Sequence, residues 1–218
     1  MISPSPKTTR NRTAVLKTLK EIYMFNFKTS LKKNTLSIAA GSLILGMTMS
    51  VPATAKTFEP QQVTDMLHLV LESDRTIYTK KVVKRLANKH KVIKATESFE
   101  DDKSLPLPAQ MFRFGAEAVA DKTDKFSYSL LSLWPINKQN KPTTELEKKG
   151  LEYINVNKGK NYYGEETLGG KKYFTAVYPD VAVATPCVGC HNNHKDTPKK
   201  DFKMGDVMGG VVIRIPLQ

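Results

Sequence analysis

The pattern of the sequence changes at one stretch, which reads Phe126-Ser127-Tyr128-Ser129-Leu130-Leu131-Ser132-Leu133. It is rich in residues that favour strands and it stops at Trp134-Pro135, so it predicts a β-strand. The sequence before it predicts two helices, and the sequence after it mixes helix and strand. This order predicts an α+β domain with a small antiparallel sheet flanked by helices.

Two helices are predicted ahead of this strand. Over 60–88, apolar residues recur at near-helical spacing and no Gly or Pro follows Pro60, so one long amphipathic helix is expected there. A polar connector over 96–106 comes next, and Pro106 and Pro108 then introduce a second helix over 109–120. Long amphipathic helices commonly pack against a core or against a second copy. The sequence therefore also predicts a homodimer formed through the first helix.

Three further elements are predicted after the strand: a short helix over 144–154, a strand over 172–178 and a last strand over 207–217. The helix is expected to be capped by Thr143 or Thr144 ahead of Glu147, which is the spacing of a capping box. In the last strand, Gly209-Gly210 is expected to form a bulge.

The chain has only two cysteines, and both lie in Cys187-Val188-Gly189-Cys190-His191, in a predicted loop ahead of the last strand. This is the attachment signature of a c-type haem. Two thiols three positions apart can each add to a vinyl group of one porphyrin. The imidazole that follows can then take the proximal position on the iron. The motif therefore predicts one covalent haem c, with His191 as the proximal ligand.

Three other interpretations of the cysteine pair are open at this point. A thioredoxin-type pair is usual near the start of a chain, where it opens a helix after a strand. A disulfide between the two cysteines would close a very small loop and stabilise little. A zinc site needs about four ligands, which His191 and His194 could complete, but the histidine spacing is cramped. Haem explains the adjacent histidine and also the export signal described next.

The first 55 residues have the pattern of a secretory signal peptide. Lys28, Lys32 and Lys33 precede an apolar run over 36–49, and an A-x-A cleavage sequence ends at Ala55. The run is shorter than the ~20 apolar residues of a spanning helix. We therefore expect a start at Met24, cleavage after Ala55 and a periplasmic protein without stable membrane insertion. The mature chain, 56–218, is expected to form one domain with the helix over 60–88 at its start.

The net charge constrains the partners. Residues 1–55 carry eight Lys/Arg and one Glu, or +7 of the formal +13, which leaves +6 on the mature chain. A basic surface of this size favours an acidic redox partner protein. Nucleic acid is not expected, because no basic run is interleaved with aromatic residues that could stack on bases.

From about Leu105 onward the chain resembles the Tll0287-like family, once classed as a domain of unknown function. The resemblance rests on four stretches: Leu105–Arg113, Ser132–Asn140, the motif at Cys187–His191, and Met208–Val212 leading into the last strand. It implies a periplasmic haem-c domain with a PAS-like fold, found both alone and as the sensor of signalling proteins. It also implies that the distal ligand of the iron comes from the helix after the Pro-x-Pro turn, where some members have a cysteine.

The distal ligand and the propionate contacts are predicted on this basis. Met111 lies on that helix and is the first candidate for the distal ligand, with His68 as the runner-up. A thioether is a good ligand for haem iron and raises its potential relative to a second imidazole. An open position, Met204 and Met208 also stay possible, whereas His194 would lie on the proximal side and His90 in a basic helix end. The candidates for propionate contacts are Arg113, Lys172 and Arg214.

Three functions follow from such a haem. A six-coordinate His/Met haem on a basic surface suits a periplasmic electron carrier, which is our first expectation. The alternative is a redox or gas (NO/CO) sensor that signals through a separate partner. Substrate turnover would need a polar acid/base group over the iron. Since the sequence offers no such group, we do not expect an enzyme.

Overall fold

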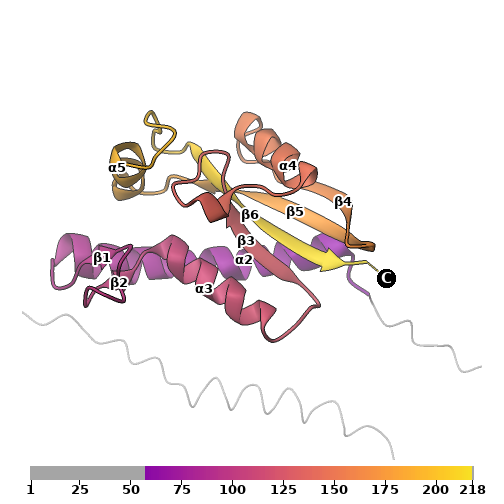
Figure 1. Cartoon of the computed structure of the whole chain (residues 1–218), viewed down its shortest axis with the longest axis horizontal. Coiled ribbons are helices and arrows are strands. Elements are labelled where there is room, and N and C mark those ends of the chain that lie inside the picture. The colour runs from indigo at the N-terminus through magenta and orange to yellow at the C-terminus, as the bar shows by residue number, and fades with distance from the viewer. Residues whose placement is uncertain (1–56, 218) are drawn as a thin grey trace, which may run out of the picture. The chain divides into compact units, whose positions relative to one another are not determined.

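The computed structural model of the chain describes residues 57–217 (Figure 1). The predicted signal peptide, with the start at Met24 and the cleavage site after Ala55, lies outside the described residues. Within 57–217, no helix is both long enough and apolar enough to cross a membrane.

The centre of the domain is an antiparallel sheet of four strands. These strands are β3 (Ser127–Leu131), β4 (Tyr162–Leu168), β5 (Lys171–Val181) and β6 (Val207–Pro216). Their order across the sheet is β3-β6-β5-β4, so the last strand in the chain lies in the middle, between β3 and β5. The expected α+β class with an antiparallel sheet is confirmed.

Helices cover both faces of the sheet. Figure 1 shows α4 (Glu145–Val156) on one face, and α2 (Pro60–Ile77) and α3 (Pro108–Ala120) on the other. The two cores follow the alternation of the central strands. Under α4, the buried residues are Leu131, Leu151, Ile154, Val177, Val207 and Val212. Under α2 and α3 they are Phe112, Ala176, Tyr178, Val211 and Ile213.

Five smaller elements complete the fold. From Tyr78 to Lys89 the first helix continues as a wider π-helical segment, η1, which ends just before His90. Between η1 and α3, the two-residue strands β1 (Ala95–Thr96) and β2 (Leu105–Pro106) pair in parallel. The short helices η2 (Lys138–Asn140) and α5 (Thr185–Asn193) follow β3 and β5. Helix α5 lies at the end of the molecule opposite the C-terminus (Figure 1).

The helix starts follow from local sequence. Pro60 and Pro108 occupy the first turn of α2 and α3, where a missing N–H costs nothing. At the start of α4, the Thr144 side chain accepts a hydrogen bond from Glu147 N at 3.1 Å, and the Glu147 carboxylate accepts one from Thr144 N at 3.0 Å. Of the two predicted caps, Thr144 is therefore the one that the structure uses.

Three predictions about local structure were wrong. Strand β4 was not predicted, because it is a half-exposed edge strand containing Gly164, Glu165 and Glu166. The cysteine motif lies in helix α5 rather than in a loop. The irregularity of the last strand falls at Met208, since Asp180 pairs with Gly209 and Val181 with Val207. Gly209 itself is needed for a close approach: a Cβ there would lie 2.5 Å from the Leu131 carbonyl oxygen.

Candidate haem attachment site

Helix α5 determines how the cysteine motif is presented. Cys187, Cys190 and His191 occupy positions i, i+3 and i+4 of this helix, so their side chains share one face. Cys187 is half-buried, Cys190 is exposed, and both thiols are free. A loop would not fix three side chains on one side in this way. The helix therefore supplies what the motif needs, which is two thiols and an imidazole directed at the same space.

Phe202 holds this helix against the body of the domain. Its backbone N–H donates to Asn192 Oδ1 at 3.0 Å, and its carbonyl accepts from Asn192 Nδ2 at 2.9 Å. Its ring is 3% exposed and meets the His191 ring edge to face, with 6.0 Å between ring centroids. Cys187 packs on the cluster that Phe202 forms with Ala182 and Met208. The motif is thus backed by an apolar surface.

His191 is half-buried, and its Nδ1 is buried without a hydrogen-bond partner. Burial lowers the pKa of this imidazole below its usual value; Asp180 opposes this effect, while Arg75 and His194 reinforce it. The ring is therefore held in the neutral form, which is the form that binds a metal.

An ion pair that the sequence did not suggest faces the motif. Arg75 of α2 binds Asp180 of β5 through two hydrogen bonds, Nη1 to Oδ1 at 2.5 Å and Nη2 to Oδ2 at 3.0 Å. Burial opposes the charge of Arg75, but Asp180 and the nearby Cys187 hold its pKa above the usual value. Its Nε is buried and has no partner. Because both charges also act on the pKa of His191, this pair lies close to the motif.

His194 is occupied by other groups. Its Nε2 lies 3.0 Å from a carboxylate oxygen of Glu97, in the connection between β1 and β2. Its Nδ1 accepts a hydrogen bond from Asp196 N at 3.1 Å. Across residues 57–217, no three His, Cys, Asp or Glu side chains are grouped so that they could hold a metal ion. The four-ligand zinc site considered from the sequence is therefore not assembled.

The candidates for the distal ligand lie on three different elements. Met111 is half-buried on α3, next to Phe112, whose ring centroid is 5.9 Å from the Arg75 guanidinium carbon. His68 of α2 stacks on Tyr178, with 4.0 Å between ring centroids and 8° between the ring planes. Burial lowers the pKa of His68 as well. Neither prediction is tested by these contacts, but the start of α3 does lie on the Arg75 side of the domain.

The other candidates for the distal ligand differ in how exposed their side chains are. Met208 is 6% exposed and belongs to the cluster on which Cys187 packs. Met204 is 54% exposed, and His90 is an exposed residue at the end of η1. Of these three, only Met208 shares a packed environment with the motif.

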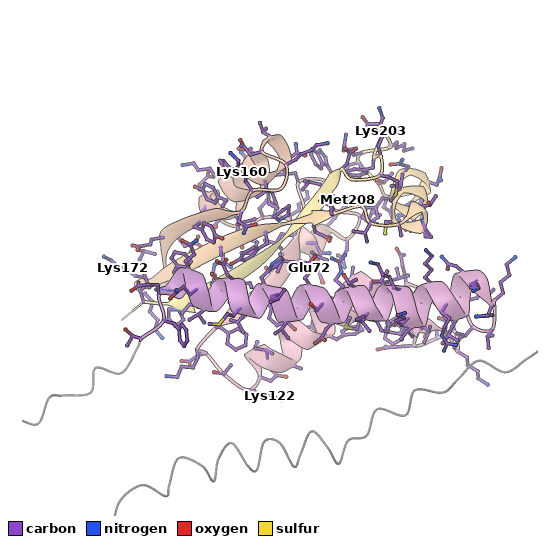
Figure 2. All side chains as sticks on the ribbon, turned by 180° about the vertical axis from the view of Figure 1, so that it is seen from behind. Glu72, Lys122, Lys160, Lys172, Lys203 and Met208 are labelled. Carbon is purple, nitrogen blue, oxygen red and sulfur yellow. The ribbon has the colours of Figure 1, made fainter. Side chains whose placement is uncertain are left out.

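The three residues predicted to contact the propionates lie on different elements. Arg113 of α3 contacts Gln139 at 3.2 Å and Glu117 at 3.4 Å. Arg214 of β6 binds Glu147 at 2.6 Å and Glu166 at 2.7 Å, on the α4 face of the sheet. Figure 2 shows Lys172 at one end of the domain, well apart from Lys203 and Met208. The structure therefore places Arg214 and Lys172 away from the motif and leaves Arg113 as a candidate, and it adds Arg75 as a cation near His191.

One signal in the sequence could have identified Arg75. It lies on the inward face of α2, four residues after Leu71, which packs on the core. A basic residue in such a position needs a buried partner. The identity of that partner could not be inferred, because Asp180 is 105 residues away in the chain.

Three comparisons with known proteins complete the description. The model of the Tll0287-like family matches residues 48–216. Among solved structures, the chain is similar to one described as the crystal structure of the cyanobacterial heme-protein Tll0287, with 12% identity and a TM-score of 0.46. That alignment covers 74% of this chain and 98% of the other. No curated protein matches. Since the family model spans well over half of the sequence, the chain belongs to the Tll0287-like family.

Proposed function

We propose that this chain carries one haem c, bound through Cys187 and Cys190 with His191 as the proximal ligand, and that it transfers electrons in the periplasm. The observation that carries the proposal is the common face of α5 on which the two thiols and the imidazole lie. The family to which the chain belongs supports haem as the cofactor, since the solved structure described above is titled as a heme-protein.

The residues present fit a covalently bound porphyrin. Two free thiols are available for thioether bonds, and the cluster behind Cys187 offers an apolar surface to a flat apolar ring. His191 is kept neutral by burial, so one ring nitrogen is available to the metal. Phe202 packs against the imidazole and limits its rotation. When bound, the haem supplies an iron that gains and loses one electron.

Asp180 has a defined role in this proposal. A histidine that binds a metal commonly donates its other ring N–H to a carboxylate or carbonyl, which fixes its orientation and raises its basicity. His191 Nδ1 lacks such a partner, and Asp180 is the carboxylate whose charge acts on it most strongly. We propose that Asp180 accepts this hydrogen bond in the haem-bound protein. Arg75 then balances the aspartate charge, so that a half-buried carboxylate can lie near the site.

The proposal also specifies the distal ligand, the fold and the partner protein. Met111 stays the first candidate for the distal ligand and His68 the second. The fold is PAS-like, which is supported by an antiparallel sheet whose first strand pairs with its last and whose two faces carry helices. The partner is an acidic redox protein, which is supported by the +6 charge of the chain after residue 55.

The attachment is tested with the exported protein. We expect a pyridine haemochrome spectrum of haem c, and haem that stays bound in a denaturing gel and resists extraction with acidified solvent. Replacing both cysteines by Ala should abolish this covalent haem. His191→Ala should remove the low-spin spectrum, whereas the matched control His194→Ala should keep it, since His194 is bound to Glu97. A wild-type protein whose haem is extracted, or that acquires none, would contradict the proposal.

Electron transfer and sensing are separated by the ferrous spectrum. A low-spin, six-coordinate haem that does not respond to CO or NO is the result expected of an electron carrier. Displacement of the distal ligand by low concentrations of gas would contradict this and favour sensing. In the same experiment, Met111→Ala should convert the iron to high spin. An unchanged spectrum would remove Met111 as a ligand and direct attention to His68.

A further inference from the structure

The outer face of α2 is apolar and exposed. Met66, Leu69, Val70 and Ile77 have exposed fractions of 47%, 64%, 59% and 55%. On the opposite side of the same helix, Leu67 and Leu71 pack on the core of the domain. Helix α2 thus has two apolar faces, and within residues 57–217 only the inner face is covered. Figure 2 views the molecule from this side, with α2 running across the front.

The spacing of this outer face is that of a helix that pairs with another helix. Leu69 and Val70 follow Met66 by three and four positions, and Ile77 follows Val70 by seven, so the four residues form one stripe along the helix. Single exposed apolar residues are ordinary, but a continuous stripe marks a contact surface. Ser73 lies within the stripe and is small enough for close approach.

The charges on this helix are divided along its length. From 59 to 74 there is no Lys or Arg, and the exposed charges are Glu59, Glu72 and Asp74. From 75 to 89 there is no Asp or Glu, and the exposed charges are Lys80, Lys81, Lys84, Arg85 and Lys89. Two copies packed in parallel would place like charges together, which is unfavourable. Two copies packed antiparallel would place each acidic half against a basic half.

We propose that a second copy of this chain packs antiparallel on the outer face of α2. The apolar stripes of the two copies cover each other when Met66 of one copy faces Ile77 of the other. Leu69 and Val70 then lie close to the two-fold axis. The same register places the acidic half of each helix alongside the basic half of its partner, so the apolar and the charged contacts agree. An anionic membrane is the less suitable occupant, because the acidic half of the helix would be repelled by it. This inference is independent of the proposed haem.

Sedimentation equilibrium on the full protein tests the dimer. The wild type should be a dimer, and Leu69→Glu with Val70→Glu should be a monomer with an unchanged far-ultraviolet circular dichroism spectrum. The matched control is Val156→Glu on α4, since Val156 is 80% exposed but lies outside the stripe; this variant should stay dimeric. A monomeric wild type, a dimer that persists in the double variant, or wild-type monomers that bind vesicles of anionic phospholipid would each overturn the proposal.

Cysteine cross-linking tests the orientation. Met66→Cys together with Ile77→Cys should form a covalent dimer, whereas Met66→Cys by itself should not. In the antiparallel pair, the two copies of residue 66 are about 17 Å apart along the helix axis. The parent protein, with only Cys187 and Cys190, is the control for cross-linking through its own thiols. Efficient cross-linking of the single variant above that control would show a parallel pair and overturn the proposed orientation.

Discussion

Arg214 and Arg75 are both half-buried and bound to carboxylates, and they differ in whether the surrounding polar groups all have hydrogen-bond partners. Arg214 lies between Glu147 and Glu166 on the α4 face, where Thr175 donates to Glu166 and the backbone N–H groups of Thr143 and Thr144 donate to Glu147. The Arg75–Asp180 pair lies on the other face, next to the cysteine motif. In the part of the chain that the structure describes, the buried side-chain nitrogens without a partner are Arg75 Nε and His191 Nδ1.

This difference separates a structural cluster from a functional one. Burying a charged side chain costs stability unless neighbouring groups pair with it and complete its hydrogen bonds. Around Arg214 the neighbouring carboxylates do so. Around the Arg75–Asp180 pair, two nitrogens without partners lie beside two free thiols, which supports the proposal that this site receives a ligand. Burial of charge is therefore not the distinguishing feature of the site; incomplete hydrogen bonding is.

The largest effect is expected at Arg214. Arg214→Met leaves Glu147, 3% exposed, and Glu166, 9% exposed, without their cation. The free energy of unfolding should fall by about 3–5 kcal/mol, as measured by urea denaturation. Arg113→Met is the matched control: its side chain is 36% exposed, and its loss should cost less than about 1 kcal/mol. If both substitutions lowered the free energy of unfolding equally, the buried Arg214 cluster would stabilise the fold no more than the exposed Arg113–Glu117 pair does.

The second effect concerns the reduction potential of the haem-bound protein. Asp180→Asn removes a negative charge near the proposed proximal ligand, which disfavours ferric iron and should raise the potential. Arg75→Met should lower it, because the aspartate is then uncompensated. Each shift should be on the order of 1 kcal/mol, or tens of millivolts. Voltammetry on the two variants measures both signs.

Arg214→Met is the control for this measurement. Residue 214 is six positions along β6 from Met208, or about 20 Å, so its charge should leave the potential almost unchanged. If Arg214→Met shifted the potential as much as Asp180→Asn does, the Arg75–Asp180 pair would have no special relation to the iron.

The smallest effect is the response of the Arg214 cluster to acid. Burial by itself would raise the pKa of Glu166, but hydrogen bonds from Thr175 and Arg214 hold it below its usual value of 4.5. A carboxylate with a lowered pKa stabilises the fold above its unfolded-state pKa. This contribution is lost as the pH falls below 4.5 and through the folded-state pKa. Stability should therefore decline in acid, as followed by urea denaturation at several pH values.

Substitution of neighbouring glutamates isolates this effect. Glu166→Gln should flatten the acid slope of the stability curve. Glu165→Gln changes the exposed residue beside it on the same strand and should leave the slope as it is. The same slope in both variants would mean that other carboxylates cause the acid response.

The local rules of the sequence predicted most of the fold. The helix starts at Pro108 and Thr144 were predictable, since proline in the first turn and a capping box act within a few residues. Helix α5 was not, because its nine residues contain Pro186 and Gly189 and have no apolar periodicity. Packing of Cys187 and Phe202 on the body of the domain stabilises this helix. Such packing cannot be predicted from a pattern of residues that are close in sequence.

The candidate site was predictable only in part, for the same reason. Cys187, Cys190 and His191 are adjacent in sequence, so the spacing itself carries the chemistry. The Arg75–Asp180 pair joins the first long helix to a strand near the other end of the chain, and only the inward position of Arg75 hinted at it. Arg214 was interpreted as a ligand contact from its charge, whereas its position on β6 places it between two carboxylates.

The central place of β6 determines how the domain can fold. It pairs with both β3 and β5, yet it is the last of these strands in the chain. Neither core can close before it arrives, because Val211 and Ile213 belong to one core and Val207 and Val212 to the other. We therefore expect no stable half-domain and a single cooperative unfolding transition. Long-range pairing of this kind also slows folding, so Cys187, which is half-buried in the folded domain, stays fully accessible until the last strand is in place.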